Sequence, residues 1–248
     1  MASYADMQGR PLSSVGATER VTYLKRVMLW TAGGLSFTAM VGLAMTGVLY
    51  VAAAAGIGFL FNPWVAFACI MGCFGIAHWV APSMVFGQQK ILGFFIACFF
   101  EGISFGWLLL QAFAMSGADG GNPFGLAGTA LALTAATAIG LTGYVWSSPK
   151  EFRLLGAALA TLGPAMLLLM VGSFAASMFM PGLFGGVFGI GITAVFVVIS
   201  AAGLLYQVNA VLHKLATDMH IEGAYLITMG VLVLYWNILT LLMSLSRD

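Results

Sequence analysis

Long apolar segments separated by short polar stretches dominate this chain of 248 residues. No Asp, Glu, Lys or Arg occurs between Arg26 and His78, a run of about 50 positions, whereas one bilayer crossing needs roughly 20 apolar residues. Two membrane helices must therefore fit in this run. The sequence Asn62-Pro63-Trp64 marks the break, because Asn and Pro end helices and Trp favours the membrane interface.

The same pattern continues to the end of the chain and predicts seven membrane-spanning helices. Pro82 and the polar sequence from Gln88 to Lys90 are expected to end the second span. The remaining breaks are also rich in Gly, Pro, Ser and charged residues. The predicted spans are residues 27–51, 64–80, 91–115, 124–146, 154–179, 183–211 and 224–245. Residues 1–26 then form a polar N-terminal arm, residues 27–245 the membrane domain, and residues 246–248 a C-terminal tail.

Composition agrees with a multi-span membrane protein. Hydrophobic residues make up 61% of the chain and charged residues only 7%, against roughly 25% charged residues in soluble domains. The net charge of +1 argues against a nucleic-acid partner, so the lipid bilayer is the expected environment. Cys69, Cys73 and Cys98 all lie in apolar runs, which favours packing over a metal site or a disulfide, and no cofactor motif is present.

The cationic residues predict the orientation. With the N-terminus on the inner side, eight of the nine Lys and Arg residues fall in inner segments and only Arg247 lies outside. This bias favours a cytoplasmic or matrix-side N-terminus. A bacterial inner membrane is the expected location, with an organellar membrane such as the mitochondrial inner membrane or the endoplasmic reticulum as the alternative.

Glu101 is the one acidic residue deep within a predicted span. A carboxylate in a bilayer costs several kcal/mol unless it is neutralised, paired or hydrated. We expect Glu101 to be buried and largely protonated, because no span offers it a Lys or Arg partner. It is either an ion or proton site, with Ser104 on the same helix face and Gln207 as a possible donor, or a hydrogen-bonded packing residue. Gly102 and the following Gly106 predict close helix packing.

Other polar residues are expected to have structural roles. Asn237, Thr240 and Ser244 form a stripe on the last span, and Ser200 with Gln207 forms another on the sixth. We expect both stripes to make hydrogen bonds between helices rather than to line a conduction path. His78 is expected to lie at the membrane interface. His213, Asp218, His220 and Glu222 are expected in a short solvated loop.

Several stretches, in a consistent order and spacing, point to one family. They are residues 23–27 (YLKRV) with 31–35 (TAGGL), residues 100–103 (FEGI), residues 143–152 with Tyr144, Ser148, Lys150 and Phe152, residues 203–207 (GLLYQ), and Asn237 with Leu241-Leu242. From about residue 23 to residue 247, the chain resembles the Bax inhibitor-1 family, also called the transmembrane Bax inhibitor motif family. The resemblance implies an all-α bundle of seven membrane helices around a central last helix, and a pH-sensitive cation or calcium leak.

The chain departs from the family at the two aspartates that carry pH sensing. One follows the tyrosine that ends the sixth span, where this chain has Gln207. The other precedes the asparagine of the last span by three residues, where this chain has Leu234. No acidic residue occurs from Gly223 to Arg247, and neither glutamine nor leucine titrates. We therefore expect the proton switch of the family not to operate here.

Two functional classes remain open. One is a non-enzymatic membrane interaction or regulatory protein, or an accessory subunit of a larger membrane complex. The other is a cation (calcium) leak channel or transporter without the aspartate gate. An enzyme is not expected, because the chain has no HExxH motif, no paired intramembrane aspartates and no GxSxG motif in a span.

The charge bias predicts that the loop around Asp119 faces outward. In a background that lacks the three native cysteines, Asp119→Cys in intact cells should react with an impermeant maleimide, because the loop follows the third span. Labelling of this position only after the inner side is made accessible would contradict the topology.

Overall fold

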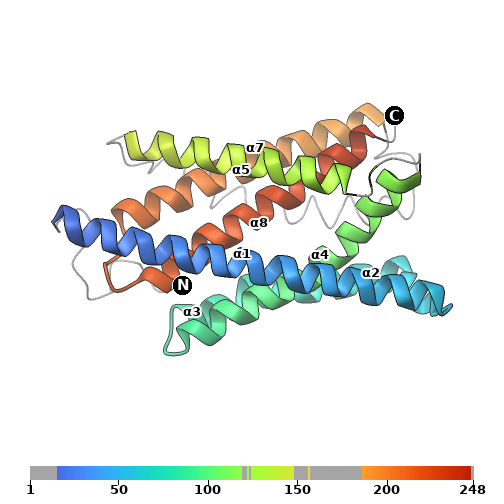
Figure 1. Cartoon of the computed structure of the whole chain (residues 1–248), viewed down its shortest axis with the longest axis horizontal. Helices are drawn as coiled ribbons and strands as arrows, with labels where there is room; N and C mark the ends of the chain where they lie inside the picture. Colours follow the sequence, from blue (N-terminus) through green and yellow to red (C-terminus); the bar gives the residue numbers. More distant parts are fainter. Residues whose placement is uncertain (1–15, 119–121, 123, 148–155, 157–185, 247–248) are drawn as a thin grey trace.

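The computed structural model describes residues 16–118, 122, 124–147, 156 and 186–246, and its fold there is a bundle of long helices (Figure 1). Six helical segments are long and apolar enough to cross a membrane. Of the predicted span 154–179 only residue 156 is described, so the count of seven spans stays a prediction. Integral membrane character and the all-helical fold are confirmed.

The six segments follow the predicted order. The first is α1, Ala17–Ala54, and the second combines α2, Pro63–Gly75, the π-helix η4, Ile76–Val80, and α3, Ala81–Val85. The short 3-10 helix η3, Gly58–Phe61, lies between them. The others are α4, Lys90–Ala118, α5, Gly125–Ser147, α7, Gly186–His213, and α8, His220–Leu245.

Two helical segments extend furthest beyond their predicted ends. Helix α1 begins at Ala17 rather than at 27, with Glu19 in its first turn, where a carboxylate favours the helix N-terminus. The second segment continues through Pro82 to Val85, so the prediction that Pro82 ends this helix is wrong. Proline is tolerated there because it lies in the first turn of α3, after the π-helix, where its missing N–H is not required.

Helices α4 and α8 form the inside of the bundle. Helix α8 packs against α1, α3, α4, α5 and α7, in agreement with the central last helix that the resemblance implies. Helix α1 lies along both α4 and α8 (Figure 1). The core is continuous and includes Phe94 from α4, Leu204 from α7 and Leu239 from α8.

Glycines of α4 permit the close approach of α1. A Cβ atom on Gly102 would lie 2.7 Å from Val41 Cβ, and one on Gly106 would lie 2.5 Å from Met45 Cγ. These distances are shorter than any relaxed carbon contact, so a side chain at either position would push the helices apart. Helix packing in lipid depends on such small residues.

We predict that Gly102→Ala destabilises the protein by about 1–3 kcal/mol through overpacking against α1. The matched control is Gly128→Ala in α5, where a Cβ atom meets nothing within 4 Å. Thermal unfolding in detergent should give a lower midpoint for Gly102→Ala and no loss for Gly128→Ala. Equal midpoints would contradict the close packing of α1 on α4.

Candidate functional site

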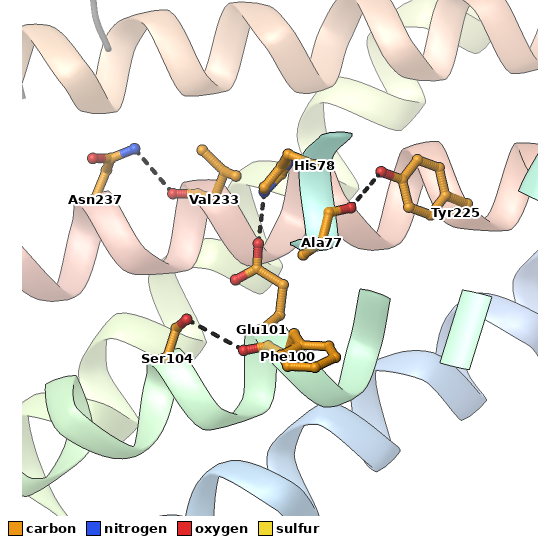
Figure 2. A network of polar contacts seen from close by, with 8 residues as sticks. All are labelled: Ala77, His78, Phe100, Glu101, Ser104, Tyr225, Val233 and Asn237. Atoms are coloured by element: carbon orange, nitrogen blue, oxygen red, sulfur yellow. Dashed lines mark hydrogen bonds and ion pairs between the residues drawn. The ribbon is translucent and has the colours of Figure 1, made fainter. Parts of the chain in front are cut away.

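Glu101 lies inside the bundle and is paired with a histidine from another helix. Glu101 is 3% exposed, and its Oε1 is 2.6 Å from Nε2 of His78 (Figure 2). The two residues are 23 positions apart in the sequence. The expectation that His78 is an interfacial side chain is therefore wrong.

The π-helix positions His78. Residues Ile76–Val80 form one turn with wider hydrogen-bond rings, a feature that often marks functional sites in helices. The hydroxyl of Tyr225 in α8 donates a hydrogen bond of 3.0 Å to the carbonyl of Ala77, which fixes this turn against the centre of the bundle (Figure 2). The imidazole also lies against the ring of Phe74, with 4.1 Å between ring centroids.

The His78–Glu101 pair has a simple charge property. One proton shared between a carboxylate and an imidazole gives either two neutral groups or an ion pair, and both forms have zero net charge. A short hydrogen bond of this kind offsets the cost of burying the carboxylate. The His78 side chain is 21% exposed, against 4% for that of Glu101, so the histidine is the more accessible member of the pair.

The other polar residues predicted near Glu101 bond within their own helices. Ser104 is buried and donates to the carbonyl of Phe100 at 3.2 Å, and Asn237 donates to the carbonyl of Val233 at 3.0 Å (Figure 2). The remaining members of the predicted stripes do the same, namely Thr240 to Trp236, Ser244 to Thr240 and Ser200 to Val197. Among the described residues, the hydrogen bonds of Asn237, Thr240, Ser244 and Ser200 thus stay within their own helices rather than joining two helices as predicted, because a carbonyl about one turn back is the nearest acceptor.

The two positions that correspond to the family aspartates lie between α7 and α8. Leu234 is fully buried, and the side-chain amide of Gln207 packs on Gly230, one turn before Leu234. Within the described part of the chain, Gln207 Oε1 accepts no hydrogen bond, and Glu101 Oε1 has His78 as its partner rather than Gln207. Whether Glu101, Ser104, Gln207 and Asn237 act together as one site stays a prediction.

A second buried ion pair was missed by the sequence reasoning. Helix α8 begins at His220, and Glu222 in its first turn is 2% exposed, with Oε1 2.5 Å from Nζ of Lys90. The prediction of a solvated loop is wrong for Glu222, although Asp218 is exposed. One sequence signal could have indicated its burial. Glu222 comes two residues after the start of the helix and directly before Gly223-Ala224-Tyr225, which are buried.

The described residues include no group of three or more His, Cys, Asp or Glu side chains that could hold a metal ion. Cys69, Cys73 and Cys98 are free thiols, and the latter two are buried.

A comparison with family models identifies the family of this chain. The model described as "Inhibitor of apoptosis-promoting Bax1" matches residues 20–247. The chain belongs to the Bax inhibitor-1 family. A search of curated proteins gave no match. This Bax inhibitor-1 protein is thus a multi-pass integral membrane protein of the family.

We predict that Glu101→Leu destabilises the protein by about 1–3 kcal/mol, because it leaves His78 without its buried partner. Glu101→Gln should lose less stability than Glu101→Leu, since an amide still offers His78 a hydrogen bond. The double variant His78→Leu with Glu101→Leu should recover part of the loss, because neither polar group then remains unpaired. The check is a double-mutant cycle of thermal stability in detergent, and strictly additive losses would argue against the pair.

Proposed function

We propose that this Bax inhibitor-1 protein is a non-enzymatic, non-conducting membrane protein that acts through other membrane proteins, as a regulator or as an accessory subunit of a larger complex. One observation carries the proposal. At the α7–α8 contact, where the resemblance implies a titrating aspartate pair, the chain has Gln207 against Gly230 and a fully buried Leu234.

The surroundings of this contact support the same conclusion. Leu204 and Val208 of α7 are almost wholly buried, and Leu239 of α8 is fully buried. A hydrated cation needs oxygen ligands or charge to enter a bundle, and at this contact Gln207 places its carbonyl among branched apolar side chains. The α7–α8 contact therefore packs two helices together without the titrating side chains that the resemblance implies at these positions.

The outer surface suits partners within the membrane. Large apolar side chains such as Leu29 of α1 and Ile139 of α5 are mostly exposed, as expected for contact with lipid or with another membrane helix. The proposal places the N-terminus on the cytoplasmic or matrix side, most simply in a bacterial inner membrane, following the distribution of Lys and Arg.

A second candidate function is a cation or proton leak without the aspartate gate. The His78–Glu101 pair favours it, because an ionisable residue inside a membrane bundle often marks an ion or proton path. In this alternative, the exposed edge of His78 supplies the entry and Glu101 the buried site.

The two candidates differ in calcium flux from proteoliposomes that contain an indicator dye. We predict that the unmodified protein gives no more flux than empty liposomes at pH 6 and at pH 8, because Gln207 and Leu234 stand at the aspartate positions and neither titrates. The double variant Gln207→Asp with Leu234→Asp should introduce a pH-dependent response, since two close carboxyls titrate as a coupled pair.

The matched control is the double variant Gln207→Asn with Leu234→Asn, which adds polar groups of similar size that do not titrate. This control should show no dependence on pH. A strong flux from the unmodified protein that changes between pH 6 and pH 8 would contradict the proposal and favour the leak through His78 and Glu101.

A further inference from the structure

Three helices meet at the buried carboxylate of Glu222. The first turn of α8, the beginning of α4 and the first half of α1 lie at the same end of the bundle (Figure 1), and each of these helices packs against the other two. Lys90, the first residue of α4, supplies the cation, and Tyr23 of α1 lies beside the next residue of α8. We call this group, Tyr23, Lys90 and Glu222, the end cluster.

The two charges of the end cluster lie in different surroundings. Glu222 is almost completely buried, whereas the Lys90 side chain is 37% exposed and thus reaches from the edge of the bundle inward. A flexible lysine can turn its ammonium group outward to water, but the carboxylate on a packed helix cannot follow it. The pair therefore has one mobile member and one fixed member.

Glu222 depends on Lys90 for its charge balance. Within the described residues, its second oxygen, Oε2, and the hydroxyl of Tyr23 have no hydrogen-bond partner. The Tyr23 hydroxyl lies 2.9 Å from the position of a Cβ on Gly223, so it is close to the helix turn that holds Glu222. A buried carboxylate without a cation is costly and is relieved by admitting water or a proton.

The other charged and titratable groups at this end do not replace Lys90. Lys25 and Arg26 of α1 are exposed, and Asp218 in the turn before α8 is exposed and negative. Lys214, after the end of α7, lies over the ring of Tyr206 with its Nζ 4.9 Å from the centroid. His213 and His220 are half-buried and form no ion pair with Glu222 in the described part of the chain.

We infer that Lys90 is a gate residue for this end of the bundle. While Lys90 is paired with Glu222, the ends of α1, α4 and α8 are closed. When the ammonium group of Lys90 turns outward, the carboxylate of Glu222 is unpaired and admits water between these helices. The inference concerns a conformational device and does not depend on whether the protein conducts ions.

Hydrogen exchange of the full-length protein in detergent, followed by mass spectrometry, tests the gate. Lys90→Met keeps the length of the side chain and removes its charge. Exchange of residues 223–230 in α8 should become about tenfold faster or more, because a buried charge loses its partner and the local structure opens. Residues 105–112, toward the other end of α4, should exchange at the wild-type rate, which distinguishes local opening from global unfolding.

The double variant Lys90→Met with Glu222→Gln removes the unpaired charge and should return exchange of 223–230 to nearly the wild-type rate. Lys25→Met, which removes an exposed lysine charge from α1, is the matched control and should change nothing. Unchanged exchange in Lys90→Met, or a double variant as fast as the single one, would overturn the inference. If Lys90→Met is not recovered as folded protein, the double variant decides alone: slow exchange supports the gate, and fast exchange or loss of folded protein refutes it.

Discussion

A carboxylate buried in a membrane bundle needs a partner, and this requirement organises the structure. Glu101 is paired with His78, which joins α4 to the second membrane segment, and Glu222 is paired with Lys90, which joins α8 to the start of α4. In each pair a basic side chain lies within hydrogen-bond distance of the carboxylate, and such pairing lowers the cost of an ionisable group in a low-dielectric interior. The π-helix carries His78 of the first pair, and the hydroxyl of Tyr225 in α8 donates a hydrogen bond to the carbonyl of Ala77 in the same turn.

The membrane helices were predictable because bilayer thickness sets the length of an apolar run, and Asn62, which caps α2 by accepting a hydrogen bond from the N–H of Trp64, marks a break as expected. Helix ends were less predictable. Helix α1 begins at Ala17, in a sequence that hydropathy assigns to a polar arm, and α3 continues past Pro82. Both extensions pack on the bundle through residues such as Tyr23 and Val85, and tertiary contacts of this kind are not visible in a hydropathy pattern.

Glu101 was recognisable because a carboxylate in an apolar run is rare, but its partner was not. His78 and Glu101 are 23 residues apart and lie in different helices, so no helical repeat predicts their contact. The π-turn that contains His78 also departs from the 3.6-residue repeat by which residues are assigned to helix faces. Asn237 was expected to bond between helices, yet its amide donates to a carbonyl one turn back. In this Bax inhibitor-1 protein, the α7–α8 contact has a buried leucine at position 234, while its ionisable pairs join other helices.

The central claim is that Glu101 and His78 form one hydrogen-bonded unit inside the bundle. Nitrogen-15 magnetic resonance of the histidine rings, with the protein in lipid, tests it most directly, because the Nε2 frequency reports the hydrogen bond of that atom. The account predicts that Glu101→Gln changes the Nε2 signal of His78 and leaves those of His213 and His220 unchanged. A His78 signal that is identical with and without the Glu101 carboxyl would contradict the account.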